Sequence, residues 1–167
     1  MITRPRRNHE PQVKGRPEMD VILIAAITAD GMIARHSLEP VRWSQDLKLF
    51  KKQTTGYPVI MGSNTFKTLV VDLKGRQAIV VHRKDDPQEI LTGIDSKRCF
   101  IIGGSKIFSR FAPYLTQLYL TYHPLIFESG LKFFGVLNNN ILLNLEKKIP
   151  IPGSKNIYQF QYRITKQ

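Results

Sequence analysis

The sequence predicts an α/β domain with a central, mostly parallel sheet, an antiparallel C-terminal hairpin and about four flanking helices. Two observations support this fold class. Between residues 20 and 127, short apolar runs rich in Val and Ile alternate with helix-like segments, which is typical of a parallel sheet covered by helices. Residues 140–165 instead hold two extended runs joined by a short turn. A chain of 167 residues is about the size of one domain and can bury a real core.

Five apolar runs are predicted as strands of the main sheet. The first of them, "DVILIAAITADG", is too short for a confident helix, is rich in Val and Ile, and ends in Asp30-Gly31. The five runs are residues 20–31, 57–62, 76–82, 98–104 and 117–127. The predicted hairpin consists of residues 140–150 and 156–165, joined by residues 151–155.

Helices are predicted between these strands. Ser44 is a good N-cap for a helix over Gln45–Thr54, and Gly56 ends that helix. Capping residues, a proline or a glycine pair open three further helices, over residues 63–70, 86–94 and 105–115. Residues 32–43 and 130–140 show no regular pattern and are predicted as irregular segments.

Composition limits both the chemistry and the location. Cys99 is the only cysteine, so no disulfide forms within the chain and zinc sites built on several cysteines are excluded. No apolar run reaches the roughly 18 residues that span a bilayer, and the N-terminus lacks the apolar part of a signal peptide. Hydrolase and zinc-protease motifs are absent, and His9, His36, His82 and His123 show no ligand spacing. We expect a cytoplasmic protein without a bound metal, whose histidines lie on the surface or in loops.

Basic residues dominate the charge, which is +12 overall. Residues 1–19 are rich in Arg and Pro and are predicted to form a flexible basic tail, so the folded domain is predicted over residues 20–167. The domain alone keeps 20 basic and 11 acidic side chains. Such a surface attracts anionic small ligands or nucleic acid. A generally basic, solvated surface is the simpler explanation, and we do not expect a nucleic-acid partner.

Two predicted strands end in glycine directly before a helix, at Gly62 and at Gly103-Gly104. Glycine lets the backbone approach a phosphate, and a helix N-terminus offers free N–H groups, so both turns are candidates for holding a dinucleotide. Each is equally consistent with an ordinary tight turn or N-cap. The basic residues 82–84 follow the third strand and either meet a 2′-phosphate, which favours NADPH, or belong to a solvated loop.

Asp46 lies on the partly apolar face of its predicted helix with Leu47 and Phe50, whereas Lys48 and Lys52 lie opposite. A carboxylate on a core-facing stripe is rare unless it is paired. Two interpretations stay open. The carboxylate can accept two parallel N–H donors from an amidine-like ring edge and assist proton transfer. Alternatively it is a first-turn acid that favours the helix dipole, and the pattern alone supports this second role better.

Several segments carry a family resemblance through their order and spacing. They are "VILIAAITADGMIA", "DLKLFKKQT" followed by "YPVIMGSNTF", "LKGRQAIVV", "IIGGSKIFSRFAP" and "LYLT". In this register they resemble the first strand and loop, the acid-bearing helix and next strand, the "LPGR" turn, the glycine-pair cofactor turn and a late central strand of the dihydrofolate reductase family. The resemblance runs from about Val21 to Phe134 and implies that family's single-domain fold.

The resemblance implies NADPH-dependent reduction of 7,8-dihydrofolate to 5,6,7,8-tetrahydrofolate, by hydride transfer to pterin C6 with protonation at N5. It implies that Asp46 is catalytic and the only ionisable group of the pterin pocket, and that Thr121 hydrogen-bonds its carboxylate. Arg76 would grip the α-carboxylate of the folate glutamate. The other implied substrate residues are Ile24, Ala25, Leu47, Phe50, Leu73 and Ile102. The implied NADPH residues are Ala26, Ile33, Gly62, Ser63, Asn64, Thr65, His82, Arg83, Ile102, Gly103, Gly104, Ser105, Lys106 and Ile107.

One departure from the family pattern affects the cofactor. Ser63 stands where the family commonly has arginine, which weakens the expected phosphate grip. His82, Arg83 and Lys106 are the candidates to compensate. The resemblance implies NADPH, and its preference over NADH would depend on these basic residues.

A second family shares some of these segments. "RPEMDVILIAAITADGMIA" and "HPLIFESGLKFF" also resemble the NADPH-dependent reductase domain of riboflavin biosynthesis, which acts on a ribosylaminopyrimidine phosphate. The helix that carries Asp46, the "LKGR" turn and Thr121 favour folate. We therefore expect an oxidoreductase of one-carbon metabolism and tetrahydrofolate biosynthesis. It would be a cytoplasmic monomer or homodimer that acts on dihydrofolate, with no membrane partner.

Overall fold

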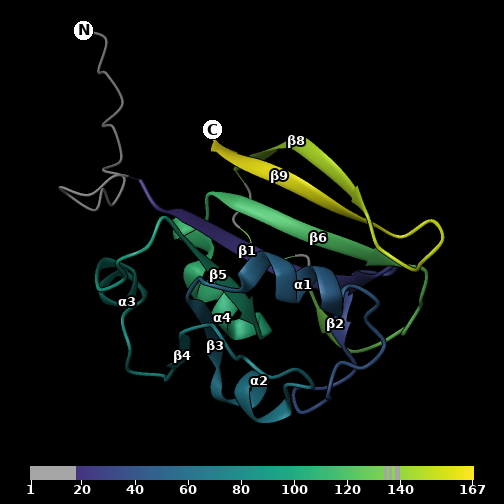
Figure 1. The fold of residues 1–167 in the computed structure, drawn as a ribbon, viewed down its shortest axis with the longest axis horizontal. Helices are drawn as coiled ribbons and strands as arrows, with labels where there is room; N and C mark the ends of the chain where they lie inside the picture. The colour runs from purple at the N-terminus through teal and green to yellow at the C-terminus, as the bar shows by residue number, and fades with distance from the viewer. Residues whose placement is uncertain (1–17, 134, 136, 138–139) are drawn as a thin grey trace, which may run out of the picture.

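The computed structural model describes residues 18–167 except 134, 136, 138 and 139 (Figure 1). The described residues form a seven-stranded sheet with helices on both of its faces, and a small two-stranded sheet beside it. The predicted α/β class is confirmed. The predicted tail, residues 1–19, lies almost wholly outside the described residues, so its flexibility stays a prediction.

The strand order across the large sheet is β4-β3-β5-β1-β6-β9-β8. Neighbours among β4, β3, β5, β1 and β6 are parallel, whereas β9 pairs antiparallel with both β6 and β8. This confirms a mostly parallel sheet with an antiparallel C-terminal hairpin. The strands are β1 Asp20–Thr28, β3 Val59–Gly62, β4 Ala78–Val81, β5 Arg98–Gly103, β6 Gln117–His123, β8 Ile141–Pro150 and β9 Tyr158–Lys166.

The four predicted helices are all present among the described residues. They are α1 Leu47–Thr54, α2 Ser63–Thr68, α3 Pro87–Thr92 and α4 Ser105–Phe111, the last continuing into a 3-10 turn, Ala112–Tyr114. The prolines and caps act as the sequence suggests: Pro87 opens α3, and the Asp86 side chain accepts a hydrogen bond from the Gln88 N–H at 2.9 Å.

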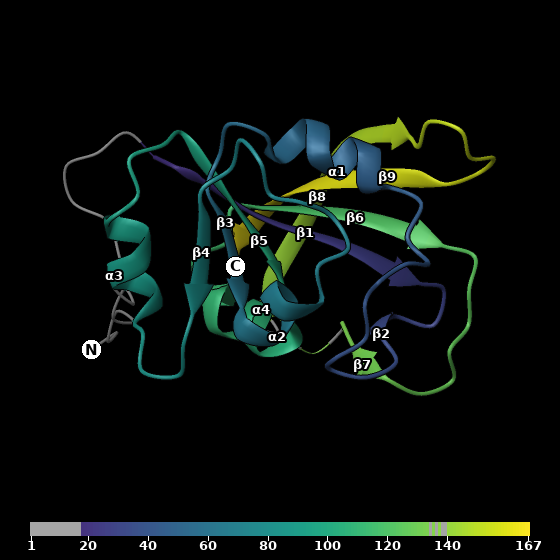
Figure 2. The same ribbon diagram turned by 60° about the horizontal axis from the view of Figure 1, so that its bottom comes forward.

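Each face of the sheet has its own apolar core, because side chains alternate along the strands. Ile22 and Ile24 of β1 face α1, where Phe50 packs against them. Leu23 belongs to the opposite core, with Phe108 of α4. Figures 1 and 2 show the same arrangement, with α1 over one face of the sheet and α4 over the other. The sheet is thereby fixed from both sides, and its strand ends can carry a rigid site.

The start of α1 differs from the prediction. The helix begins at Leu47, and Asp46 occupies its N-cap position, where its carbonyl accepts the first helical hydrogen bond, from Phe50 at 2.8 Å. Ser44, predicted as the cap, instead donates its hydroxyl to the Asp46 carboxylate. A serine and an aspartate two residues apart are both good caps, and the pattern cannot say which one the helix uses.

Three other segments were predicted wrongly. β6 ends at His123 rather than at residue 127, because Pro124 lacks the N–H that a central strand needs. Met32–Ala34 (β2) and Leu131–Lys132 (β7), both within segments predicted as irregular, pair antiparallel to form the small sheet. Strands of two or three residues that pair across about 100 positions leave no local pattern to detect.

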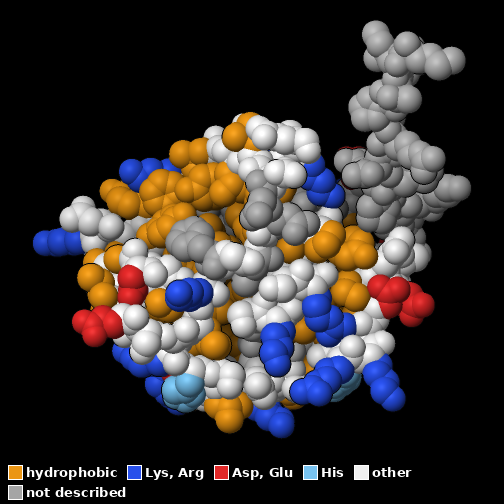
Figure 3. Space-filling view, turned by 180° about the vertical axis from the view of Figure 1, so that it is seen from behind, with side chains coloured by type: hydrophobic (Ala, Val, Ile, Leu, Met, Phe, Trp, Pro, Cys, Tyr) orange, Lys and Arg blue, Asp and Glu red, His pale blue; other side chains and the backbone are white. Residues whose placement is uncertain are grey.

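The surface reflects the basic composition. Seen from behind, Lys and Arg side chains are spread over the face, and hydrophobic side chains gather in its upper part (Figure 3). The edge strand β8 exposes three leucines, Leu142, Leu143 and Leu145. Cys99 lies buried within β5, and this burial raises the pKa of its thiol to about 12. The cysteine is therefore a core residue and not a nucleophile.

Candidate active site

A cleft opens beside α1, where β1 and β5 approach their carboxyl ends. The empty space beside its walls, open solvent included, is about 970 Å³. Its walls come from β1, α1, the turn after β5, and the segments 33–44 and 65–71. Ligands of open parallel sheets bind at this edge.

The Asp46 carboxylate lines this cleft and is nearly buried, with 5% of the residue exposed. Its Oδ1 accepts a hydrogen bond from the Ser44 hydroxyl, which is buried as well. Among the described residues this is the only side-chain donor to the carboxylate. A carboxylate held in this way keeps acceptor capacity toward the cleft, and the cost of its burial favours a ligand that donates to it.

Asp46 is not the only ionisable residue of the whole cleft. His36 and Glu39 line it too. Glu39 is already paired, because it accepts hydrogen bonds from the backbone N–H and the guanidinium of Arg35. Within the described part of the cleft wall, Asp46 remains the carboxylate without a cationic partner.

The N-terminal end of α1 is tied to β6 through His123. The Gln45 N–H donates to His123 Nε2 at 2.9 Å, and His123 Nδ1 lies 3.0 Å from the Thr121 carbonyl. His123 is 2% exposed, so its prediction as a surface or loop histidine was wrong. The error has a physical reason: whether a polar residue at the end of a strand is covered depends on the segment that packs over it, here Trp43.

The C-terminal end of α1 is tied to β9. Gln53 and Gln159 exchange two hydrogen bonds, of 2.7 and 3.0 Å, between their side-chain amides. Gln161 donates to Gln159 at 3.0 Å, so the fully buried Gln159 amide is well satisfied. Sequence reasoning missed this network, although glutamine alternating with aromatic residues along β9 is a signal that one face of the hairpin is polar and covered.

Arg76 follows the Gly75 turn beneath α1, and its side chain is fully buried. Its guanidinium donates to Thr54 Oγ1 at 3.1 Å and to the Asp72 carbonyl, and it lies 5.8 Å from the centre of the Phe50 ring. Nε has no hydrogen-bond partner among the described residues. A buried guanidinium with an unused donor is suited to an anionic ligand. Arg76 does not itself line the cleft, although Phe50 does.

The predicted hydrogen bond from Thr121 to Asp46 is absent. Thr121 is fully buried in β6, and its hydroxyl has no partner in the described part of the chain. The strand register places it beside Ala26 of β1, which lines the cleft. Ser44 takes the expected place on the carboxylate. A hydroxyl left unpaired inside the protein is costly and marks a position that a ligand or water satisfies.

The turn after β5 is built for close backbone approach. Gly103 has a φ of +142°, and a Cβ at this position would lie 3.2 Å from Thr65 Oγ1. A Cβ on Gly62 would lie 3.1 Å from the Ile107 side chain. The turns that begin α2 and α4 therefore meet face to face, with no side-chain cap on either helix. The peptide between Gly103 and Gly104 is cis.

The basic residues after β4 lie in an ordered turn. The His82 N–H donates to Asp85 Oδ2 at 2.7 Å, and Arg110 of α4 donates to the His82 carbonyl at 3.0 Å. The side chains of His82 and Arg83 are exposed. Arg110, which the sequence analysis did not select, thus attaches this turn to the helix that follows the glycine pair.

The structure brings part of the predicted site to one cleft. The predicted residues that line it are Ile24, Ala25, Ala26, Ile33, Asp46, Leu47, Phe50, Thr65, Ile102, Gly103 and Gly104. Those that do not are Gly62, Ser63, Asn64, Leu73, Arg76, His82, Arg83, Ser105, Lys106, Ile107 and Thr121. The lining residues that were missed are Ala34, His36, Ser37, Glu39, Val41, Ser44, Thr68, Leu69, Val70, Val71, Phe108 and Leu131. Most of these come from the two connecting segments, whose path only the fold determines.

Comparisons with known proteins agree with this geometry. A family model described as dihydrofolate reductase matches residues 20–167. The chain belongs to the dihydrofolate reductase family. The type 3 dihydrofolate reductase of Salmonella typhimurium is 34% identical over 116 residues, which are 62% of this chain and 72% of that protein. The dihydrofolate reductase of Bacillus subtilis (strain 168) is 30% identical over 156 residues, which are 85% and 91% of the two chains.

A solved structure gives the same fold. Dihydrofolate reductase from Enterococcus faecalis, complexed with NADP(H) and RAB-propyl, matches with a TM-score of 0.68 at 19% identity. The match covers 87% of this chain and 96% of that one. This match confirms the predicted fold, and the family model and the relatives confirm the predicted family and an oxidoreductase activity of the dihydrofolate reductase type. No helix in the described part of the chain is long and apolar enough to cross a membrane.

Proposed function

We propose that the protein reduces 7,8-dihydrofolate to 5,6,7,8-tetrahydrofolate with NADPH as its cofactor. The observation that carries the proposal is the buried Asp46 carboxylate, held by Ser44 and facing the cleft without a cationic partner. A pterin ring offers two parallel N–H donors, N3–H and the 2-amino group, which match the two oxygens of a carboxylate. The apolar neighbours Leu47 and Phe50 suit the flat faces of that ring.

The other candidate substrate contacts come from residues that lie beside the cleft and not on its wall. The free Thr121 hydroxyl, one strand away from Ala26, is the candidate partner for the pterin amino group or for a water bound to it. The buried Arg76 guanidinium, with its unused Nε donor below Phe50, is the candidate partner for the glutamate carboxylate. Asp46 would hold the ring in the orientation in which N5 is protonated and C6 is reduced.

The residues on the other side of the cleft fit a dinucleotide. The two turns pack closely, because a Cβ at Gly62 would crowd Ile107 and a Cβ at Gly103 would crowd Thr65. The first N–H groups of α2 and α4 have no side-chain cap and can donate to phosphate oxygens. When bound, NADPH supplies the hydride for pterin C6. Ala26, Ile33 and Ile102 would line the nicotinamide end and exclude water from it.

The test is the absorbance of NADPH, followed with and without dihydrofolate. We expect NADPH oxidation only when dihydrofolate is present, and tetrahydrofolate as the product. A protein that leaves dihydrofolate unchanged but consumes NADPH with a ribosylaminopyrimidine phosphate would contradict the proposal and select the riboflavin-pathway activity. We further propose that the enzyme works in the cytoplasm as a monomer or homodimer, which fractionation and light scattering would test.

A further inference from the structure

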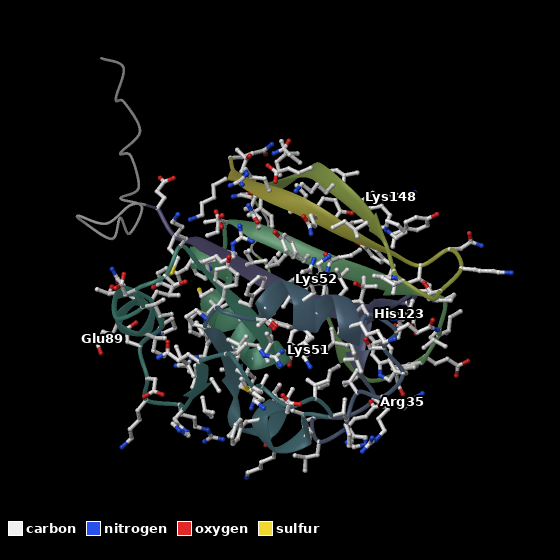
Figure 4. The ribbon with its side chains drawn as sticks, viewed as in Figure 1. Arg35, Lys51, Lys52, Glu89, His123 and Lys148 are labelled. Carbon is white, nitrogen blue, oxygen red and sulfur yellow. The ribbon has the colours of Figure 1, made fainter. Side chains whose placement is uncertain are left out.

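His123 occupies an unusual position for an ionisable side chain. It is the last residue of β6, it is 2% exposed, and the Trp43 ring lies edge-on to it with the ring centroids 5.2 Å apart. Figure 4 shows it at the side of the sheet where α1 begins. It is not among the substrate and cofactor contacts proposed above, and it does not line the cleft.

The hydrogen bonds of His123 determine which nitrogen carries its proton. A backbone N–H can only donate, so Nε2, 2.9 Å from the Gln45 nitrogen, is the acceptor. The proton of the neutral ring is then on Nδ1, which donates to the Thr121 carbonyl at 3.0 Å. The ring therefore bridges two backbone groups on different elements, and each bond requires this tautomer.

Both bridged residues adjoin the polar groups of the pterin site. Gln45 directly precedes Asp46, and the Thr121 carbonyl belongs to the residue whose hydroxyl is unpaired. Helix α1 has no side-chain cap of its own, because the Asp46 side chain is engaged with Ser44. Without the acceptor at Nε2, nothing else among the described groups holds the Gln45 N–H.

We propose that His123 is a positioning residue for dihydrofolate reduction, an inference that rests on the function proposed above. Its neutral, Nδ1-protonated ring fixes the turn that carries Ser44, Gln45 and Asp46, and so sets the distance between the carboxylate and the Thr121 side of the pterin site. The essential feature is the hydrogen-bond acceptor at the ε position, and the bulk of the ring is secondary.

Two conservative variants separate these features. In His123→Gln the side-chain oxygen can occupy the position of Nε2 and accept from Gln45, whereas in His123→Asn the amide ends at the position of Nδ1 and cannot reach. We expect His123→Asn to raise the KM for dihydrofolate roughly tenfold, the usual effect of losing one buried hydrogen bond. His123→Gln should stay within roughly threefold of the unmodified enzyme, and the KM for NADPH should change in neither variant.

Three results would overturn the proposal: both variants behaving like the unmodified enzyme, both losing dihydrofolate affinity equally, or the KM for NADPH rising together with that for dihydrofolate. The ¹⁵N chemical shifts of the His123 ring in the unmodified protein give a test that depends on neither activity nor the folding of a variant. A proton on Nε2 in that spectrum contradicts the inference. If the unmodified protein does not reduce dihydrofolate at all, the proposed function fails, while the ring spectrum still decides the tautomer.

Discussion

The proposed pterin half and the proposed cofactor half of the cleft differ in the groups that form them. The proposed pterin half is supported by hydrogen bonds around Asp46 and α1: between Ser44 and Asp46, between His123 and the backbone N–H of Gln45, and between Gln53 and Gln159. The cofactor half consists of glycine turns, and its neighbouring polar side chains, such as Ser63 and His82, are exposed. Under the proposed function, preorganised side chains would select the substrate, and the shape of the backbone would select the cofactor.

Asp46→Asn, in the proposed pterin half, should have the largest effect on activity. The amide keeps the size of the carboxylate but replaces one acceptor oxygen by a donor, which opposes the pterin N–H groups. We expect kcat/KM for dihydrofolate to fall by roughly 10²–10⁴, the range for loss of a proton-transfer group. Stopped-flow measurement of NADPH oxidation gives the rate, and fluorescence titration should show an unchanged Kd for NADPH. A rate near that of the unmodified enzyme would remove Asp46 from the mechanism.

Arg76→Gln tests whether the pterin half extends to the glutamate tail. A charge-assisted hydrogen bond contributes about 1.5–3 kcal/mol, so we expect the KM for dihydrofolate to rise roughly 10- to 100-fold. The matched control is the substrate: a dihydropterin that lacks the glutamate should be reduced equally well by both proteins. An equal loss with both substrates would mean that Arg76 acts only through Thr54 and the stability of α1.

Gly104→Ala tests the cofactor half alone. Gly104 has a φ of −86°, and a Cβ there would meet Thr65 Oγ1 at 3.7 Å, an ordinary contact, so the variant should fold normally. The added methyl occupies space that the cofactor needs, and we expect the Kd of NADPH to rise roughly tenfold, as for the loss of a close contact. Gly93→Ala, at the C-cap of α3, is the control and should leave it unchanged. An unaffected Kd for Gly104→Ala would show that the turn does not hold the cofactor.

The sequence could predict the features that leave local patterns, but not those that depend on contacts between distant residues. The five parallel strands, the hairpin and the glycine turns leave local patterns, and the order of segments singled out Asp46 and Arg76. His123, Gln159 and the β2–β7 pair act through contacts that span 78 to 106 positions. Their burial depends on the finished packing, so no window of the sequence contains it. The start of α1 could not be predicted for a different reason. Ser44 and Asp46 lie two positions apart and both suit the N-cap, so the pattern does not decide between them.

Ser63→Arg tests the proposed cofactor half by adding a charged side chain next to its glycine turns. Ser63 is exposed at the first position of α2, beside the glycine turns. An arginine there can reach a 2′-phosphate, but it is solvated, so the gain is small. We expect the Kd of NADPH to fall roughly two- to fivefold, while that of NADH, which lacks the phosphate, stays constant. Ser63→Gln supplies similar length without charge and should change neither value. If NADH gains as much as NADPH, the added charge does not act on the 2′-phosphate, and specificity must come from another part of the cofactor half.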